Sequence, residues 1–172
     1  FNREKFNEIK DPLSSVTASG DDTMLLLRIK KKNPGKIRFN KDRRALVETF
    51  PEKTLEKFWN QRKRWVSKSR YYQDFDILAL SLIVFGTNLL ILLFLVMMII
   101  DSLFMNYFIG LLLLKFLIDF ILLFPVVRYY KKYHLLLAYV PGQILYPFYA
   151  TVTALGGKFS GFRWKNRYYH VN

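Results

Sequence analysis

The chain has 172 residues, a formal net charge of +14 and no cysteine. A sequence without cysteine excludes disulfide bonds and thiolate metal sites. The excess of cations flanks long apolar segments, so anionic lipid head groups explain it at least as well as nucleic acid does. We therefore expect membrane lipids and no nucleic acid among its partners.

Charged residues are distributed unevenly. Residues 1–76 hold 19 of the 27 Lys+Arg and 11 of the 13 Asp+Glu, whereas residues 77–127 hold only Asp101, Lys115 and Asp119. The charged part is too small to bury a generous core by itself. Because residue 1 is Phe and no signal peptide precedes the charged part, we expect the C-terminal piece of a longer protein. A processed protein that is complete in itself is the alternative.

The first clear element is a helix that begins at an acidic pair. Asp21 and Asp22 precede a run with apolar spacing and a lysine-rich end, which suits the helix dipole and predicts about three turns. Asn33-Pro34-Gly35 ends it. Short extended pieces are expected at residues 36–39 and 45–50, the second of them a strand.

A second helix is predicted after Thr49-Phe50-Pro51-Glu52, which has the spacing of a capping box. One face of this helix carries a stripe of mostly apolar residues: Leu55, Phe58, Trp59, Arg62, Trp65 and Val66. We assign residues 54–76 to a basic amphipathic helix that lies in the bilayer interface. An ordinary helix facing a protein core fits the same pattern.

Two long apolar segments follow, at residues 77–100 and 103–127, and each is long enough to cross the hydrocarbon layer. Lys115 and Asp119 interrupt the second. They are four residues apart, so they share a helix face, and we expect them to pair.

The distribution of cations sets the expected topology. The loop at residues 101–106 has none, whereas residues 128–134 are rich in them, which places residues 1–76 and 128–134 in the cytoplasm. A third apolar segment at residues 135–157 contains Pro141 and Pro147 and precedes a basic tail, residues 158–172. A full crossing would place that tail outside, so we expect a broken, re-entrant or interfacial segment and a cytoplasmic tail.

The cluster Gln61-Arg62-Lys63-Arg64-Trp65 combines an amide, three cations and an indole. Such residues have the donors to hold a diphosphate and a flat ring on which a sugar can stack. With Ser19-Gly20-Asp21-Asp22 before it and membrane segments after it, the sequence resembles the C-terminal half of membrane-integrated family 2 glycosyltransferases, which include cellulose, chitin and hyaluronan synthases. The tail Phe162-Arg163-Trp164-Lys165 resembles the ending of smaller bacterial members.

The resemblance covers essentially the whole chain and implies its fold class. Residues 1–53 would be an α/β remnant, the C-terminal part of a cytoplasmic GT-A type nucleotide-sugar transferase domain. An α-helical membrane region would follow at residues 77–157. The localisation implied is the inner membrane of a bacterium.

The resemblance also implies roles for single residues. Asp22 matches the catalytic base, which accepts the proton of the acceptor hydroxyl as it attacks the anomeric carbon. Asp21 matches its acidic neighbour, although both could simply cap the following helix. Gln61, Arg64 and Trp65 match the Gln-x-x-Arg-Trp motif that binds the acceptor and the diphosphate.

One departure from the family concerns the metal. The family's uridine site and the Asp-x-Asp that holds Mg²⁺ or Mn²⁺ lie upstream of the acidic pair, and the residues before Asp21 contain no Asp-x-Asp. We expect no metal ligands in this chain. The divalent cation and the donor would bind to a missing N-terminal half of the same protein.

The activity implied is that of an inverting hexosyltransferase, which moves a sugar from a nucleotide-sugar donor to a glycan or lipid-linked acceptor. This chain alone would be inactive. The alternative is a non-catalytic, basic membrane adaptor that binds anionic lipid or a partner.

Overall fold

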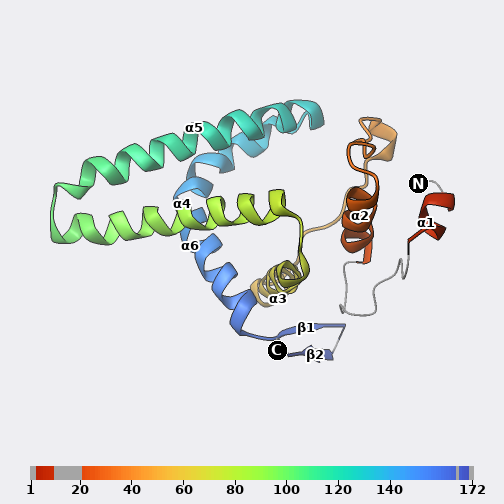
Figure 1. Cartoon of the computed structure of the whole chain (residues 1–172). Helices are drawn as coiled ribbons and strands as arrows, with labels where there is room; N and C mark the ends of the chain where they lie inside the picture. The colour runs from red at the N-terminus through yellow and green to blue at the C-terminus, as the bar shows by residue number, and fades with distance from the viewer. Residues whose placement is uncertain (1–2, 10–20, 166, 171–172) are drawn as a thin grey trace. The chain divides into compact units, whose positions relative to one another are not determined.

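The computed structural model describes residues 3–9, 21–165 and 167–170. The chain forms two units, residues 1–74 with 160–172, and residues 75–159 (Figure 1). The division follows the composition, because almost all of the charge lies in the first unit and the long apolar segments form the second. Residues 10–20, which include the Ser-Gly before the acidic pair, lie outside the described residues.

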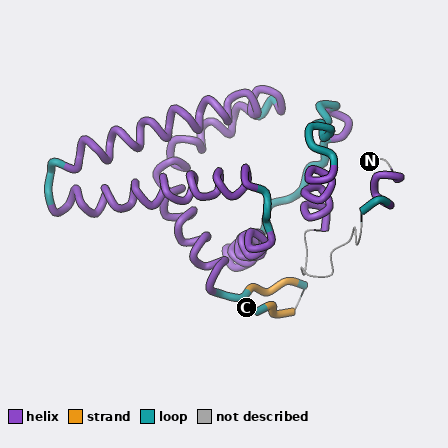
Figure 2. The backbone as a smooth tube through the Cα atoms, viewed as in Figure 1, coloured by secondary structure: helices purple, strands orange, loops and turns teal. Residues whose placement is uncertain are grey.

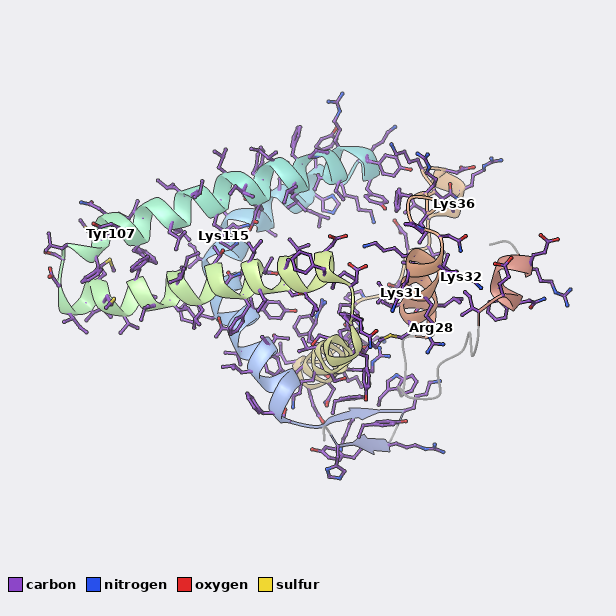
Figure 3. All side chains as sticks on the ribbon, viewed as in Figure 1. Arg28, Lys31, Lys32, Lys36, Tyr107 and Lys115 are labelled. Atoms are coloured by element: carbon purple, nitrogen blue, oxygen red, sulfur yellow. The ribbon has the colours of Figure 1, made fainter. Side chains whose placement is uncertain are left out.

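The first unit begins with a short helix, α1 (Arg3–Asn7), followed by α2 (Asp21–Lys32). Helix α2 confirms the helix predicted after the acidic pair. It ends as predicted, with the Asn33 amide donating to the Ile29 carbonyl at 2.8 Å and Gly35 at a φ of +73°. The cations of its basic end are labelled in Figure 3, together with one just beyond it: Arg28, Lys31, Lys32 and Lys36.

The predicted strand at residues 45–50 is wrong. Residues 46–50 have no regular structure, and a short 3₁₀ turn, η1 (Arg43–Ala45), precedes them. Val47 is 82% exposed and Phe50 98% exposed, so no neighbouring strand covers them. An extended segment without a hydrogen-bonding partner is not stable as a strand. The described residues therefore show no sheet of the GT-A type.

Helix α3 (Leu55–Ser67) confirms the amphipathic helix but begins later than predicted. Its N-cap is Thr54, whose hydroxyl accepts from the Lys57 amide at 3.2 Å. Thr54 has the extended backbone and the side-chain oxygen that an N-cap requires, so the capping box proposed at Thr49 is wrong. The α-helix also stops earlier than residue 76, because a 3₁₀ turn, η2 (Lys68–Tyr71), follows it.

The first unit closes with a β-hairpin of two short strands, β1 (Phe162–Trp164) and β2 (Arg167–Tyr169) (Figure 2). Lys165 has a φ of +48°, the left-handed conformation that a tight hairpin turn needs. Phe162 is buried and stacks on Tyr169. A Cβ on Gly161 would lie 2.5 Å from the Tyr169 carbonyl oxygen, so only glycine fits before β1.

The second unit consists of α4 (Phe75–Ile100), α5 (Phe104–Tyr130), a 3₁₀ segment η3 (Tyr133–Ala138) and α6 (Tyr139–Phe159). Three stretches are long and apolar enough to cross a membrane: Phe75–Ile100, Phe104–Tyr130 and Tyr133–Gly157. Most of their apolar side chains are exposed, as expected where lipid covers them. These features are those of an integral membrane protein.

Helices α4 and α5 form an antiparallel pair, and α6 crosses them (Figure 1). The break in the third apolar segment falls where η3 passes into α6. The prolines do not interrupt α6, which is one helix. Pro141 sits in its first turn, where no intrahelical N–H bond is lost. Pro147 lies inside the helix.

The predicted pairing within α5 is confirmed. Lys115 Nζ lies 2.5 Å from Asp119 Oδ2, and the lysine side chain is only 6% exposed. Gln143 of α6, which the sequence did not single out, completes the group by accepting from Lys115 and donating to Asp119. The cluster therefore joins α5 to α6.

Candidate functional site

Helix α3 presents two different faces. One is the predicted apolar stripe, which includes Phe58 and Trp65. The other is polar and carries Gln61 and Arg64, which are three residues apart and so lie on the same side of the helix. The Gln-x-x-Arg-Trp motif is thus divided, with its amide and second arginine on the polar face and its tryptophan on the apolar stripe.

The polar face borders an open cavity of about 680 Å³ between α3 and the C-terminal hairpin. Four cationic side chains and two carboxylates line it, with two amides and two aromatic rings: Lys57, Arg64, Arg163, Lys165, Glu52, Glu56, Asn60, Gln61, Trp164 and Tyr168. Cations outnumber carboxylates, so the cavity favours an anionic ligand.

Two of the four cations of the cavity lie over the indole of Trp164. The Arg64 guanidinium lies 5.1 Å from the centre of the ring, and Lys165 Nζ lies 4.8 Å from it. Cation–π attraction holds both charges close to one surface without neutralising them. Trp164 therefore positions cations that come from two distant parts of the chain.

Two hydrogen bonds fix the hairpin to α3. The Arg163 amide donates to Asn60 Oδ1 at 2.8 Å, and Lys63 Nζ donates to the Gly161 carbonyl at 3.4 Å. Gln61 is oriented separately, since its Nε2 donates to Glu52 Oε1 at 3.3 Å. Lys63, a variable position of the Gln-x-x-Arg-Trp motif, thus contributes to the anchoring of the tail.

Trp65 does not line the cavity. Its indole is 45% exposed, and the guanidinium of Arg62 lies 4.3 Å from the ring centre and 4.7 Å from that of Phe58. Arg62 therefore covers one face of the ring. The rest of the indole is exposed.

Asp22 lies near the end of η2 and is not among the residues that line the cavity. Its side chain is exposed, and the Thr23 hydroxyl is 3.5 Å from its Oδ1. Burial and the negative charge of Asp22 raise the pKa of the Tyr72 phenol, which places the carboxylate close to Tyr72. An ion pair of 2.6 Å between Lys30 and Asp74 joins α2 to the same segment. The Asp21 side chain lies outside the described part.

Among the described residues, no three His, Cys, Asp or Glu side chains are grouped to hold a metal ion. The cavity itself has the chemistry for a phosphate ligand. Arginine gives bidentate hydrogen bonds, lysine gives mobile charge, and a neighbouring indole gives a flat apolar surface.

The sequence did not assign a role to the hairpin residues Arg163, Lys165 and Tyr168, or to Asn60. Two signals pointed to the tail: its alternation of aromatic and basic residues, and its expected return to the side of the membrane where α3 lies. Neither signal specifies a contact with α3, because that contact depends on Asn60, an unremarkable residue outside the motif.

No protein-family model matches the chain, and comparisons with curated proteins and with solved structures find no match either.

Proposed function

We propose that the chain is the C-terminal part of an inverting, membrane-bound family 2 glycosyltransferase that transfers a sugar from a nucleotide-sugar to a glycan or lipid-linked acceptor. The observation that carries the proposal is the cavity on α3. Gln61 and Arg64, the polar members of the motif, line it together with cations of the hairpin. A departing nucleoside diphosphate requires such a surface, since cations that stabilise its developing charge lower the barrier.

The position of Asp22 supports its role as the base. It is an exposed carboxylate at the start of α2, so an acceptor hydroxyl can approach it. Asp22 lies apart from the cavity residues, as expected if the reacting carbon is held between the base and the diphosphate site. The GT-A sheet that binds the donor, with Mg²⁺ or Mn²⁺ on the diphosphate, would be supplied by the upstream part of the protein.

The contact between α3 and the hairpin supports the expected topology. The Arg163–Asn60 bond requires residues 160–170 and α3 to lie on the same side of the membrane. If α4 and α5 both cross, the segment η3–α6 then begins and ends on that side. We therefore propose a re-entrant or interfacial α6 and a cytoplasmic tail, in the inner membrane of a bacterium.

The test is sugar transfer by the full-length protein in membranes, with a labelled nucleotide-sugar and with product recovered as glycan or lipid. Asp22→Asn keeps the size of the side chain and removes the base, so we expect at least a hundredfold loss of transfer, the contribution typical of general bases. Asp42→Asn is the matched control, because Asp42 is an exposed carboxylate that contacts Arg44 and does not line the α3 cavity.

Wild-type membranes without transferase activity towards any nucleotide-sugar would contradict the proposal and favour the adaptor of anionic lipids. Equal transfer by the two variants would contradict the role of Asp22. Membrane insertion, measured by resistance to carbonate extraction, should be the same for both variants because neither change touches the apolar helices.

A further inference from the structure

A second cavity lies within the apolar unit, between α4, α5 and α6. Its volume is about 600 Å³, a size typical of sites for small ligands. Besides Thr87 and two tyrosines, the polar end of its lining consists of Asn88 of α4, Lys115 and Asp119 of α5, and Gln143 of α6. Lys115 lies near the middle of α5 (Figure 3).

The charges at this end are balanced. Lys115 Nζ donates to Asp119 Oδ2 and to Gln143 Oε1, each at 2.5 Å, and the Tyr146 ring centre lies 4.8 Å from it. Gln143 Nε2 also donates to Asp119 Oδ2 at 3.0 Å. One cation and one carboxylate neutralise each other, so an ionic ligand would bring an uncompensated charge into apolar surroundings.

The side-chain oxygen of Asn88 is a hydrogen-bond acceptor without a donor among the described residues. Asn88 is 1% exposed, its Nδ2 donates to the Val84 carbonyl at 2.7 Å, and its Oδ1 has no hydrogen-bond partner among the described residues. A buried carbonyl without a donor is unfavourable, and the middle of a membrane helix offers little water to supply one. A ligand that donates a hydrogen bond to this oxygen would supply the missing donor.

The rest of the cavity is a trough for a hydrocarbon chain. Its wall is formed by one side of α4 and one side of α5: Leu80, Ile83, Val84, Ile118, Leu122, Leu123 and Val126. Leu80 precedes Asn88 by eight residues, which is about 12 Å along a helix. A ligand that fits both ends is uncharged, with an apolar tail and a hydroxyl group.

We propose that this cavity binds a neutral long-chain alcohol, whose tail lies along the α4–α5 trough and whose hydroxyl donates to Asn88 Oδ1. The inference does not depend on the glycosyltransferase proposal, because it uses no residue of the α3 cavity. The ligand class follows from the unpaired acceptor, the balanced charges and the apolar wall.

The test compares three photoreactive probes with identical tails on the full chain in lipid nanodiscs: hexadecanol, its methyl ether and hexadecanoate. We expect saturable labelling with at least fivefold higher affinity for the alcohol than for the ether, the value of about one hydrogen bond. Asn88→Leu should remove this preference by weakening the alcohol alone. Ser81→Ala, a polar-to-apolar change elsewhere on α4, should leave it unchanged.

A second variant keeps the test decisive if Asn88→Leu does not fold. Ile83→Trp fills the trough from a position that is 65% exposed and should lower labelling by the alcohol and the ether alike. Equal affinity for alcohol and ether in the wild-type chain would overturn the proposal, and would mean that water alone satisfies Asn88. Tighter binding of hexadecanoate, or labelling that Ile83→Trp does not change, would overturn it as well.

Discussion

Two regions of this chain hold charge in opposite ways. In the α3 cavity, four cations face two carboxylates, and the wall is open and polar. In the apolar unit, Lys115 is 6% exposed and is bonded to both Asp119 and Gln143. Cations that water can reach remain unneutralised at little cost, whereas a charge in apolar surroundings must be paired.

This difference in charge pairing indicates different roles for the cations of the α3 cavity and for the Lys115–Asp119–Gln143 cluster. Cations outnumber carboxylates on the wall of the α3 cavity, so this region has the net charge of a site for an anionic ligand. In the Lys115–Asp119–Gln143 cluster, the lysine charge is neutralised by the Asp119 carboxylate. The hydrogen bonds of Gln143 to both residues hold α6 against α5. Changes to the cations of the α3 cavity should alter the binding of anions, and changes to Lys115 or Asp119 should alter stability.

Among the changes that compare the two regions, the largest effect is expected at Arg64, where Arg64→Ala removes a cation from the α3 cavity. We expect about a hundredfold lower kcat for sugar transfer by the full-length protein, the usual result of deleting one electrostatic stabiliser of the transition state. The measurement is the initial rate at saturating nucleotide-sugar. Arg64→Lys should recover part of the loss, because it restores the charge without the bidentate geometry.

Arg38→Ala is the matched control, since Arg38 is an exposed arginine in the segment before η1. It should leave the rate within about twofold of the wild type, as surface substitutions usually do. An Arg64→Ala enzyme with wild-type kcat would show that the α3 cavity does not stabilise the leaving group.

Much of the architecture could be predicted from the sequence, because it depends on local patterns. The acidic start and basic end of α2, the apolar lengths of α4 and α5, and the four-residue spacing of Lys115 and Asp119 each act within one helix. The start of α3 was misplaced because two threonines, Thr49 and Thr54, compete for the cap, and their backbone conformations decide between them.

The candidate site was harder to predict from the sequence because it joins residues 103 positions apart. Asn60 meets Arg163 through a backbone amide of the tail, a contact without any signal in the side-chain pattern. Gln143 joins Lys115 in the same way, through the tertiary packing of α6 on α5. Spacing along the chain finds pairs within one helix, whereas partners on different elements emerge only in the folded structure.

The second prediction concerns the stability of the apolar unit. Lys115→Met leaves the Asp119 carboxylate without its cation, and we expect the free energy of unfolding to fall by about 2 kcal/mol. This loss of stability is smaller than that expected when one partner of a fully buried ion pair is removed, because Asp119 is 37% exposed. Thermal unfolding of the full chain in detergent micelles measures the change.

The double variant with Lys115→Met and Asp119→Leu is the control for this loss. Removing both charges leaves no buried ion, so most of the lost stability should return. A double variant less stable than Lys115→Met alone would contradict the view that the cluster is a neutralised pair.

A smaller effect is expected at Asn60, which links the two halves of the α3 cavity. Asn60→Ala removes the acceptor of the Arg163 amide, so the hairpin cations are held less firmly. We expect about fivefold weaker binding of pyrophosphate to the full chain, the equivalent of one hydrogen bond. Isothermal titration calorimetry measures it. Gln73→Ala, an exposed amide in the same unit, should bind pyrophosphate as the wild type does, and equal losses in both variants would rule out the anchoring role.

The smallest effect distinguishes the two regions by salt. Raising the ionic strength from about 0.01 to 0.1 M shortens the screening length from about 30 to 10 Å, which weakens attraction between exposed charges but acts less on buried pairs. Pyrophosphate affinity at the α3 cavity should therefore fall severalfold. The stability difference between the wild type and Lys115→Met should change by less than about 0.5 kcal/mol, because the ion pair lies in apolar surroundings that mobile ions do not enter. If that difference follows the salt as steeply as the pyrophosphate affinity, the Lys115 pair is solvated and the contrast between the regions fails.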